Sequence, residues 1–150
     1  MKGKAYLKFG IMLALSFVSM YAVMFLNADR LEHVMLSYTR TYMTALMIAP
    51  MAVIMLGMMW SMYESKAANV AILALAVIVF VVCLVSLRNQ VPIRDVQYMK
   101  AMIPHHSSAI MVSQEADLQD PETKRLAEEI IEAQEREIAR MKKMLHRLEP

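Results

Sequence analysis

The sequence predicts an all-α protein in which three transmembrane helices precede a short antiparallel helical hairpin. Of the 150 residues, 58% are hydrophobic, which exceeds the roughly 45–50% of an ordinary soluble domain. The charges are also unevenly distributed, since residues 1–90 contain three Asp or Glu and residues 91–150 contain eleven. The chain is therefore predicted to divide into a transmembrane domain, residues 1–90, and a water-exposed hairpin, residues 91–150.

Three stretches without a formal charge are each long enough to cross a bilayer. They cover about residues 9–28, 41–63 and 67–87, and a helix needs about 20 apolar residues to cross the hydrocarbon core. A backbone in lipid must satisfy its own hydrogen bonds, so these stretches are predicted to be helices. For the first stretch a cleaved signal peptide is the alternative, although its apolar run is longer than the about 7–15 residues of a signal core.

Basic residues near the N-terminus predict the orientation. Lys2, Lys4 and Lys8 precede the first span, and positive charge beside a span favours the cytoplasmic side. Lys66 before the third span agrees with this orientation, whereas Arg88 after that span disagrees. With the N-terminus in the cytoplasm, three crossings put the hairpin outside it.

Amphipathic patterns predict two helices after residue 91. Asp120 is placed as an N-cap and Pro121 at the first helical position, so the second helix begins there. About four residues join the helices, which must therefore be antiparallel. Pro104 is expected to kink the first helix. Apolar seams repeat every three or four residues: Met99, Met102, His106, Ala109, Ser113 and Ala116 in the first helix, and Ala127, Ile131, Gln134, Ile138, Met141, Leu145 and Leu148 in the second.

Two helices of this length cannot bury a full core alone. We therefore expect the hairpins of several subunits to pair into a four-helix bundle, which makes membrane lipid and further copies of the chain the expected partners. Packing of the hairpin against the spans is the alternative. The net charge of only +2 gives no argument for nucleic acid, and the single cysteine, Cys83, excludes an intrachain disulfide and a Cys-based zinc site.

Sulfur and imidazole groups are concentrated at the start of the hairpin. Residues 99–111 contain three Met and the pair His105 and His106. Thioethers are soft ligands and suit Cu(I), and by extension Ag(I), together with imidazole. Because the hairpin is antiparallel, residues near its end are expected to return to the same place. The predicted ligands are Met99, Met102, His105, His106, Met141 and Met144, and the competing interpretation is that the Met side chains fill the core.

Two polar residues on the inward face of the second helix, Gln134 and Glu137, need hydrogen-bonding partners if they are buried. They are placed either to orient His105 or His106 as supporting groups around a metal or to bond across a dimer.

The two hairpin motifs resemble a known family. The first is Met99-x-x-Met-Ile-Pro-His-His-x-x-Ala-Ile, and the second is Ala127-x-x-Ile-Ile-x-x-Gln-x-x-Glu-Ile-x-x-Met. Together, over residues 93–146, they resemble the bacterial domain-of-unknown-function family 305. The resemblance implies a ferritin-like helical bundle. It also implies a periplasmic protein that binds copper through Met and His and is linked to copper tolerance. Together with the three spans it implies a bacterial inner membrane, and it points to the same six ligands with Gln134 and Glu137.

A second group of Met residues lies in the second span. Met43, Met47, Met51, Met55, Met58 and Met62 recur every three or four residues and would place thioethers along one helix face. They are either packing residues or a relay that carries Cu(I) through the membrane.

The sequence thus predicts a membrane protein that binds Cu(I) in its hairpin for sequestration, delivery or tolerance. Copper transport along the Met stripe and a metal-free oligomeric module are the alternatives. Catalysis is not expected, because the sequence contains no nucleophile–base pair, Gly-rich phosphate loop or paired carboxylates. Glu-x-x-His, a ligand motif of di-iron bundles, is also absent, so we expect no di-iron centre, haem or nucleotide.

Overall fold

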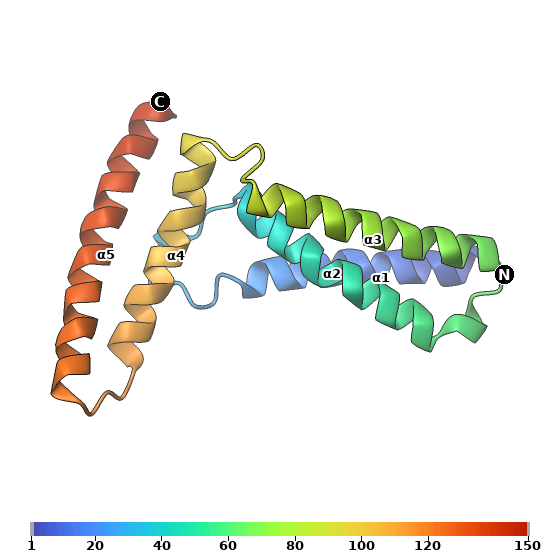
Figure 1. Ribbon diagram of the computed structural model, residues 1–150, viewed down its shortest axis with the longest axis horizontal. Helices are drawn as coiled ribbons and strands as arrows, with labels where there is room; N and C mark the ends of the chain where they lie inside the picture. The colour runs from blue at the N-terminus through green and yellow to red at the C-terminus, as the bar shows by residue number, and fades with distance from the viewer. Residues whose placement is uncertain (1, 150) are drawn as a thin grey trace. The chain divides into compact units, whose positions relative to one another are not determined.

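The computed structural model describes residues 2–149. Its regular structure over these residues is helical throughout (Figure 1), so the predicted all-α class is confirmed. The elements in chain order are α1 (Lys2–Val23), η1 (Leu31–His33), α2 (Tyr38–Met58), η2 (Trp60–Met62), α3 (Lys66–Arg88), α4 (Asp95–Glu115) and α5 (Pro121–Leu148).

The chain folds into two compact units. The first contains the residues up to Val23 together with Thr39–Pro92, and the second contains Met24–Tyr38 with the residues from Ile93 onward. The sequence alone placed the boundary near residue 90 and left residues 24–38 with the transmembrane domain. In the structure this loop between α1 and α2 packs with the hairpin.

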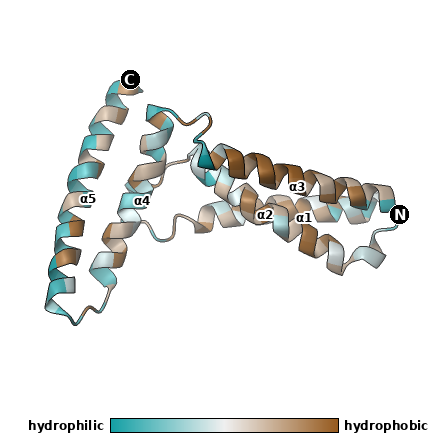
Figure 2. Cartoon of the chain, viewed as in Figure 1, coloured by the Kyte–Doolittle hydropathy of each residue, from teal (hydrophilic) through white to brown (hydrophobic). Residues whose placement is uncertain are grey.

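The first unit contains three helices long and apolar enough to cross a membrane, Gly3–Val23, Tyr38–Met58 and Lys66–Arg88. Figure 2 shows that α3 is hydrophobic along most of its length. The first two helices end five residues earlier than the charge-free stretches do. Residues 24–28 leave the helix, and Asn27 donates a hydrogen bond to the Ser108 hydroxyl at 2.7 Å. After α2 the chain turns into the short 3-10 helix η2.

The polar groups at one end of the first unit bond to each other. Asn69 is fully buried, and its amide donates to the Tyr63 carbonyl at 3.1 Å and accepts from the Tyr6 hydroxyl at 2.9 Å. These bonds tie α1 and the α2–α3 turn to the beginning of α3. An apolar cluster continues from this end: Phe9, Ala52, Leu56, Tyr63 and Ala76.

The second unit is built on the antiparallel pair α4 and α5, which lie side by side in Figure 1. The predicted cap is confirmed, because the Asp120 carboxylate accepts the Thr123 amide at 2.7 Å and Pro121 is the first residue of α5. α4 runs as one helix through the buried Pro104. The core between the helices contains Met99, Ile103, Ile110, Ile138, Met141 and Leu145.

The buried residues of α4 differ from the predicted seam, of which only Met99 and His106 are buried. Ile103 and Ile110 are buried in place of the predicted Ala109 and Ala116, and Leu148 is exposed. The buried positions of α4 are therefore rotated toward Ser107, which faces the α1–α2 loop.

Candidate metal site on the helical hairpin

A pocket of about 350 Å³ opens between α4 and α5. Its lining contains three thioethers, one imidazole and one carboxylate within a single space, contributed by Tyr98, Met102, His106, Glu137, Arg140, Met141 and Met144. Four of the six predicted ligands therefore line one pocket. The spacing explains this convergence, because residues 102 and 106 are one turn apart on α4 and residues 141 and 144 are one turn apart on α5.

His106 is held in a defined orientation. Its Nδ1 lies 2.9 Å from the carbonyl oxygen of Met102. A carbonyl only accepts, so Nδ1 carries the hydrogen and donates it. The ring is mostly buried, and its Nε2 lies 2.7 Å from Oε2 of Glu137. When Nε2 carries a proton, it donates a hydrogen bond to the Glu137 carboxylate. When Nε2 carries no proton, its lone pair can bind a metal ion.

Glu137 makes a contact with a histidine, which is one of the two arrangements that the sequence left open for it. Its side chain is 54% exposed, so it can rotate away from Nε2 without disturbing the core. A metal-bound imidazole commonly donates its other N–H to a backbone carbonyl or a carboxylate, which fixes the tautomer. The bond from His106 to the Met102 carbonyl is of this kind.

Met99 lies beside this pocket rather than in it. It lines an adjoining pocket of about 250 Å³, which shares Tyr98, Met141 and Met144 with the first. The Met99 side chain is buried in the core between the helices. The two pockets together bring four of the predicted thioether ligands to one side of the hairpin.

Two predicted site residues lie outside both pockets. His105 is exposed to solvent, with its ring centre 6.0 Å from that of His106. Gln134 is half-buried, and neither pocket includes it. Within residues 2–149, no group of three or more His, Cys, Asp and Glu side chains is arranged to hold a metal ion. A metal bound in the pocket would therefore depend on the thioethers.

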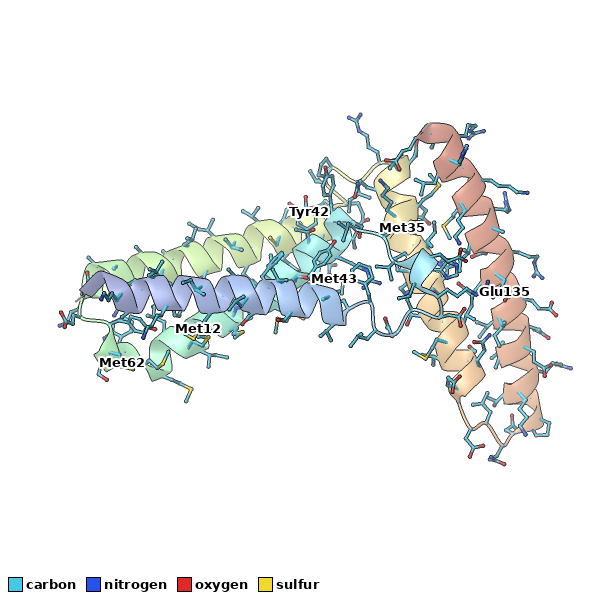
Figure 3. The ribbon with its side chains drawn as sticks, turned by 180° about the vertical axis from the view of Figure 1, so that it is seen from behind. Met12, Met35, Tyr42, Met43, Met62 and Glu135 are labelled. Carbon is cyan, nitrogen blue, oxygen red and sulfur yellow. The ribbon has the colours of Figure 1, made fainter. Side chains whose placement is uncertain are left out.

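The opposite side of the hairpin is covered by the α1–α2 loop, which the sequence did not assign to it. The Ser107 hydroxyl, fully buried, accepts the Asp29 amide at 2.9 Å and lies 2.9 Å from Nδ1 of His33. Met35 of the same loop, labelled in Figure 3, packs against the hairpin core. Lys142 of α5 pairs with Glu32 of η1 at 3.0 Å.

The electrostatics of this loop follow from its burial and its charged neighbours. Burial, with a contribution from the Lys142 ammonium, lowers the pKa of His33 below its usual value. The neutral ring can then accept the Ser107 hydroxyl hydrogen at Nδ1. The hydrogen bond from Lys142 and its charge lower the pKa of Glu32. The mixed charges of the loop were visible in the sequence, but no pattern indicated their contact with α4 and α5.

The Met stripe of α2 is only partly continuous. Met43, Met47, Met51 and Met55 follow one face at intervals of four residues within the helix. Met43 and Met47 are about 40% exposed, whereas Met51 and Met55 are half-buried. Met58 is the last residue of α2, and Met62 belongs to η2. Figure 3 labels Met43 and Met62 at opposite ends of this segment.

Comparison with known proteins finds two similarities. The model of the family described as "Domain of unknown function (DUF305)" matches residues 84–145. An uncharacterized protein of Acanthamoeba polyphaga mimivirus is 33% identical over 138 residues, which cover 90% of this chain and 89% of that protein. The second similarity therefore extends well beyond the hairpin into the apolar helices. No solved structure matches the chain.

Proposed function

The chain belongs to the DUF305 family, and on this premise we propose that its C-terminal hairpin binds Cu(I), or Ag(I), through Met and His side chains. The observation that supports this proposal is the shared pocket of Met102, His106, Met141 and Met144. Thioether sulfur is soft and imidazole is borderline, a combination that selects Cu(I) over hard cations. The role would be sequestration, delivery or tolerance rather than catalysis.

The proposed location is a bacterial inner membrane with the N-terminus in the cytoplasm and the hairpin outside it. Two features support this topology. Lys4, Lys8 and Lys66 flank spans on the side that the positive-inside rule assigns to the cytoplasm. The α1–α2 loop and the hairpin belong to one unit, which requires both to lie on the same side of the membrane, and three crossings would place them so. A Met/His site also suits an oxidising compartment, where exposed thiols form disulfides.

The test is a titration of the full chain with Cu(I) in competition with a chromogenic chelator. Met102→Leu and Met144→Leu keep an apolar side chain of similar size and remove only the sulfur. Met111→Leu on α4, outside the pocket, is the matched control, and His146→Ala is the control on α5. We expect each pocket variant to lose affinity by about tenfold or more and both controls to keep it. Equal affinity in all four variants would end the copper proposal.

A second candidate function is copper transport along α2. The regular Met43, Met47, Met51 and Met55 series on one helix face favours it. The measurement is Cu(I) flux into proteoliposomes. Met47→Leu and Met51→Leu should slow the flux if the thioethers form a relay, whereas Met12→Leu on α1 should not. Flux that is unchanged in the first two variants would leave the stripe with a packing role.

A further inference from the structure

The hairpin has one covered side and one open side. Helical geometry places residues 98, 102, 105, 109 and 112 of α4 in one row, since they are spaced by four, three, four and three residues. This row is on the pocket side, and Ser107, which bonds to the α1–α2 loop, is about a half-turn away from it. We call the pocket side the open flank; on α4 it comprises Tyr98, Met102, His105, Ala109 and Val112.

α5 carries a matching row. Its members are spaced by four, three, seven and four residues, which keeps them on one helix face, and three of them line the two pockets on the open flank. The row contains Ile130, Gln134, Glu137, Met144 and Leu148. Each helix therefore has one seam toward the other and a second seam on the open flank. A helix that packs against one neighbouring helix needs only one apolar seam, whereas a helix in a four-helix bundle buries two seams.

The open flank exposes large apolar side chains. Tyr98 is 53% exposed, Val112 58% and Leu148 44%. Two exposed charges of opposite sign, Glu137 and Arg140, lie at the pocket between these residues. A surface with both signs can pair with itself, because a two-fold axis brings the acidic group of one copy to the basic group of the other.

We propose that a second copy of this chain packs its hairpin on the open flank and closes the metal pocket. The identity of the ion in the pocket rests on the proposed function, whereas the contact between the two hairpins does not. Two hairpins then complete the four-helix bundle, with the repeating apolar seams in the interior. The pocket, which is open in one copy, becomes enclosed by two. Enclosure excludes water from a site whose thioethers bind a soft cation.

Cysteine cross-linking tests the contact in the full chain. In a Cys83→Ser background, single cysteines are placed on the open flank at Tyr98, Ala109 or Val112. Matched controls, Gln114→Cys on α4 and Ala139→Cys on α5, are exposed but lie on the side of Ser107 and the loop. Proteoliposomes that contain a metal chelator are treated with a short bis-maleimide, and covalent dimer is measured on a denaturing gel.

We expect dimer from at least one open-flank cysteine and none from the two controls. Arg140→Glu should reduce the dimer by placing like charges opposite each other, and adding Glu137→Arg should restore it. The proposal is overturned if no open-flank cysteine gives dimer. This conclusion is the same for cysteines that react with a water-soluble maleimide and for cysteines that react only with a lipid-soluble one. Because metal is absent, the result is independent of whether the pocket binds copper.

Discussion

His106 illustrates how a single backbone carbonyl determines the chemistry of an imidazole. The carbonyl of Met102, one turn earlier, takes the Nδ1 hydrogen at 2.9 Å and leaves Nε2 directed at the pocket. His105, the next residue, is rotated by about 100° around the helix and is exposed. Of the two adjacent histidines, one therefore faces the pocket and the other faces solvent, and this difference arises from helical geometry alone.

Glu137 contributes the negative charge closest to Nε2, so its removal should weaken cation binding. In Glu137→Gln we expect the Cu(I) affinity to fall by roughly 10–100-fold, as is typical when a group that supports a ligand is changed. Glu135→Gln is the control, since Glu135 lies on the same helix and lines a different pocket. The chelator competition assay measures both variants. An affinity equal to that of the wild type would show that the carboxylate takes no part in binding.

Ser107 holds the α1–α2 loop, and its loss should release that loop. Ser107→Ala leaves the Asp29 amide and Nδ1 of His33 without their partner, which should cost about 1–3 kcal/mol. Hydrogen exchange of the Asp29 amide is the readout and should become faster. Ser108→Ala removes only the exposed bond with Asn27 and should change exchange at Asp29 little. Unchanged protection of Asp29 in Ser107→Ala would contradict the assigned bond.

Acidification should loosen the same loop. The pKa of His33 is lowered from its ordinary 6.5 by burial and by Lys142 and Arg30, against the opposing effect of Glu32 and Asp29. Above pH 6.5 the ring is neutral in the open and closed loop alike. Below it, the open loop binds a proton more readily, so the stability of the closed loop decreases as the pH falls.

The measurement is exchange protection across residues 24–38 between pH 7.5 and pH 5.5, corrected for the intrinsic exchange rate. His33→Gln should remove the part of the pH dependence that belongs to the imidazole. The lowered pKa of Glu32 acts in the same direction at lower pH, because its pairing with Lys142 is lost when the carboxylate is protonated. Loop protection that does not change with pH in the wild type would argue against a buried neutral His33.

At the scale of the element, α5 has a well-defined beginning. The Asp120 carboxylate accepts both the amide and the hydroxyl hydrogen of Thr123 at 2.7 Å, and these bonds lower the pKa of Asp120. Pro121 supplies a backbone already suited to the first helical position. The cap lies far along the chain from Met141 and Met144, so its role is to set where the helix starts rather than to form the pocket.

Loss of this cap should fray only the first turn of α5. In Asp120→Ala we expect faster hydrogen exchange at Thr123 and in the following turn, with unchanged exchange around Ile138. Asp117→Ala is the control, because the Asp117 carboxylate accepts its hydrogen bond from the nearby Gln119 side chain rather than from α5. Exchange at Thr123 that is as slow in Asp120→Ala as in the control would mean that the cap contributes nothing to the helix end.

At the scale of the whole molecule, the α1–α2 loop links the two halves of the sequence. It precedes α2 and yet shares a compact unit with the residues that follow α3. In the proposed topology both segments therefore lie on one side of the membrane. The α2–α3 turn, one crossing away from each of them, is expected on the other side.

Single cysteines can check this topology in the Cys83→Ser background. We expect Leu36→Cys in the loop and Gln114→Cys in the hairpin to react with an impermeant maleimide added outside intact cells. Ser61→Cys in the α2–α3 turn should react only after the membrane is opened. Labelling of Leu36→Cys and Gln114→Cys from different sides would exclude three crossings.

The sequence by itself determined the helices of this protein. Charge-free stretches of about 20 residues predicted three apolar helices, and Asp120 with Pro121 predicted the start of α5, because these signals are local and depend only on neighbouring residues. The spacing of Met102, His106, Met141 and Met144 also indicated a shared face. Only the tertiary structure decided that the α1–α2 loop covers one side of the hairpin. That contact joins His33 and Asp29 to Ser107 across more than 70 residues, and no periodic pattern encodes a contact between segments so far apart.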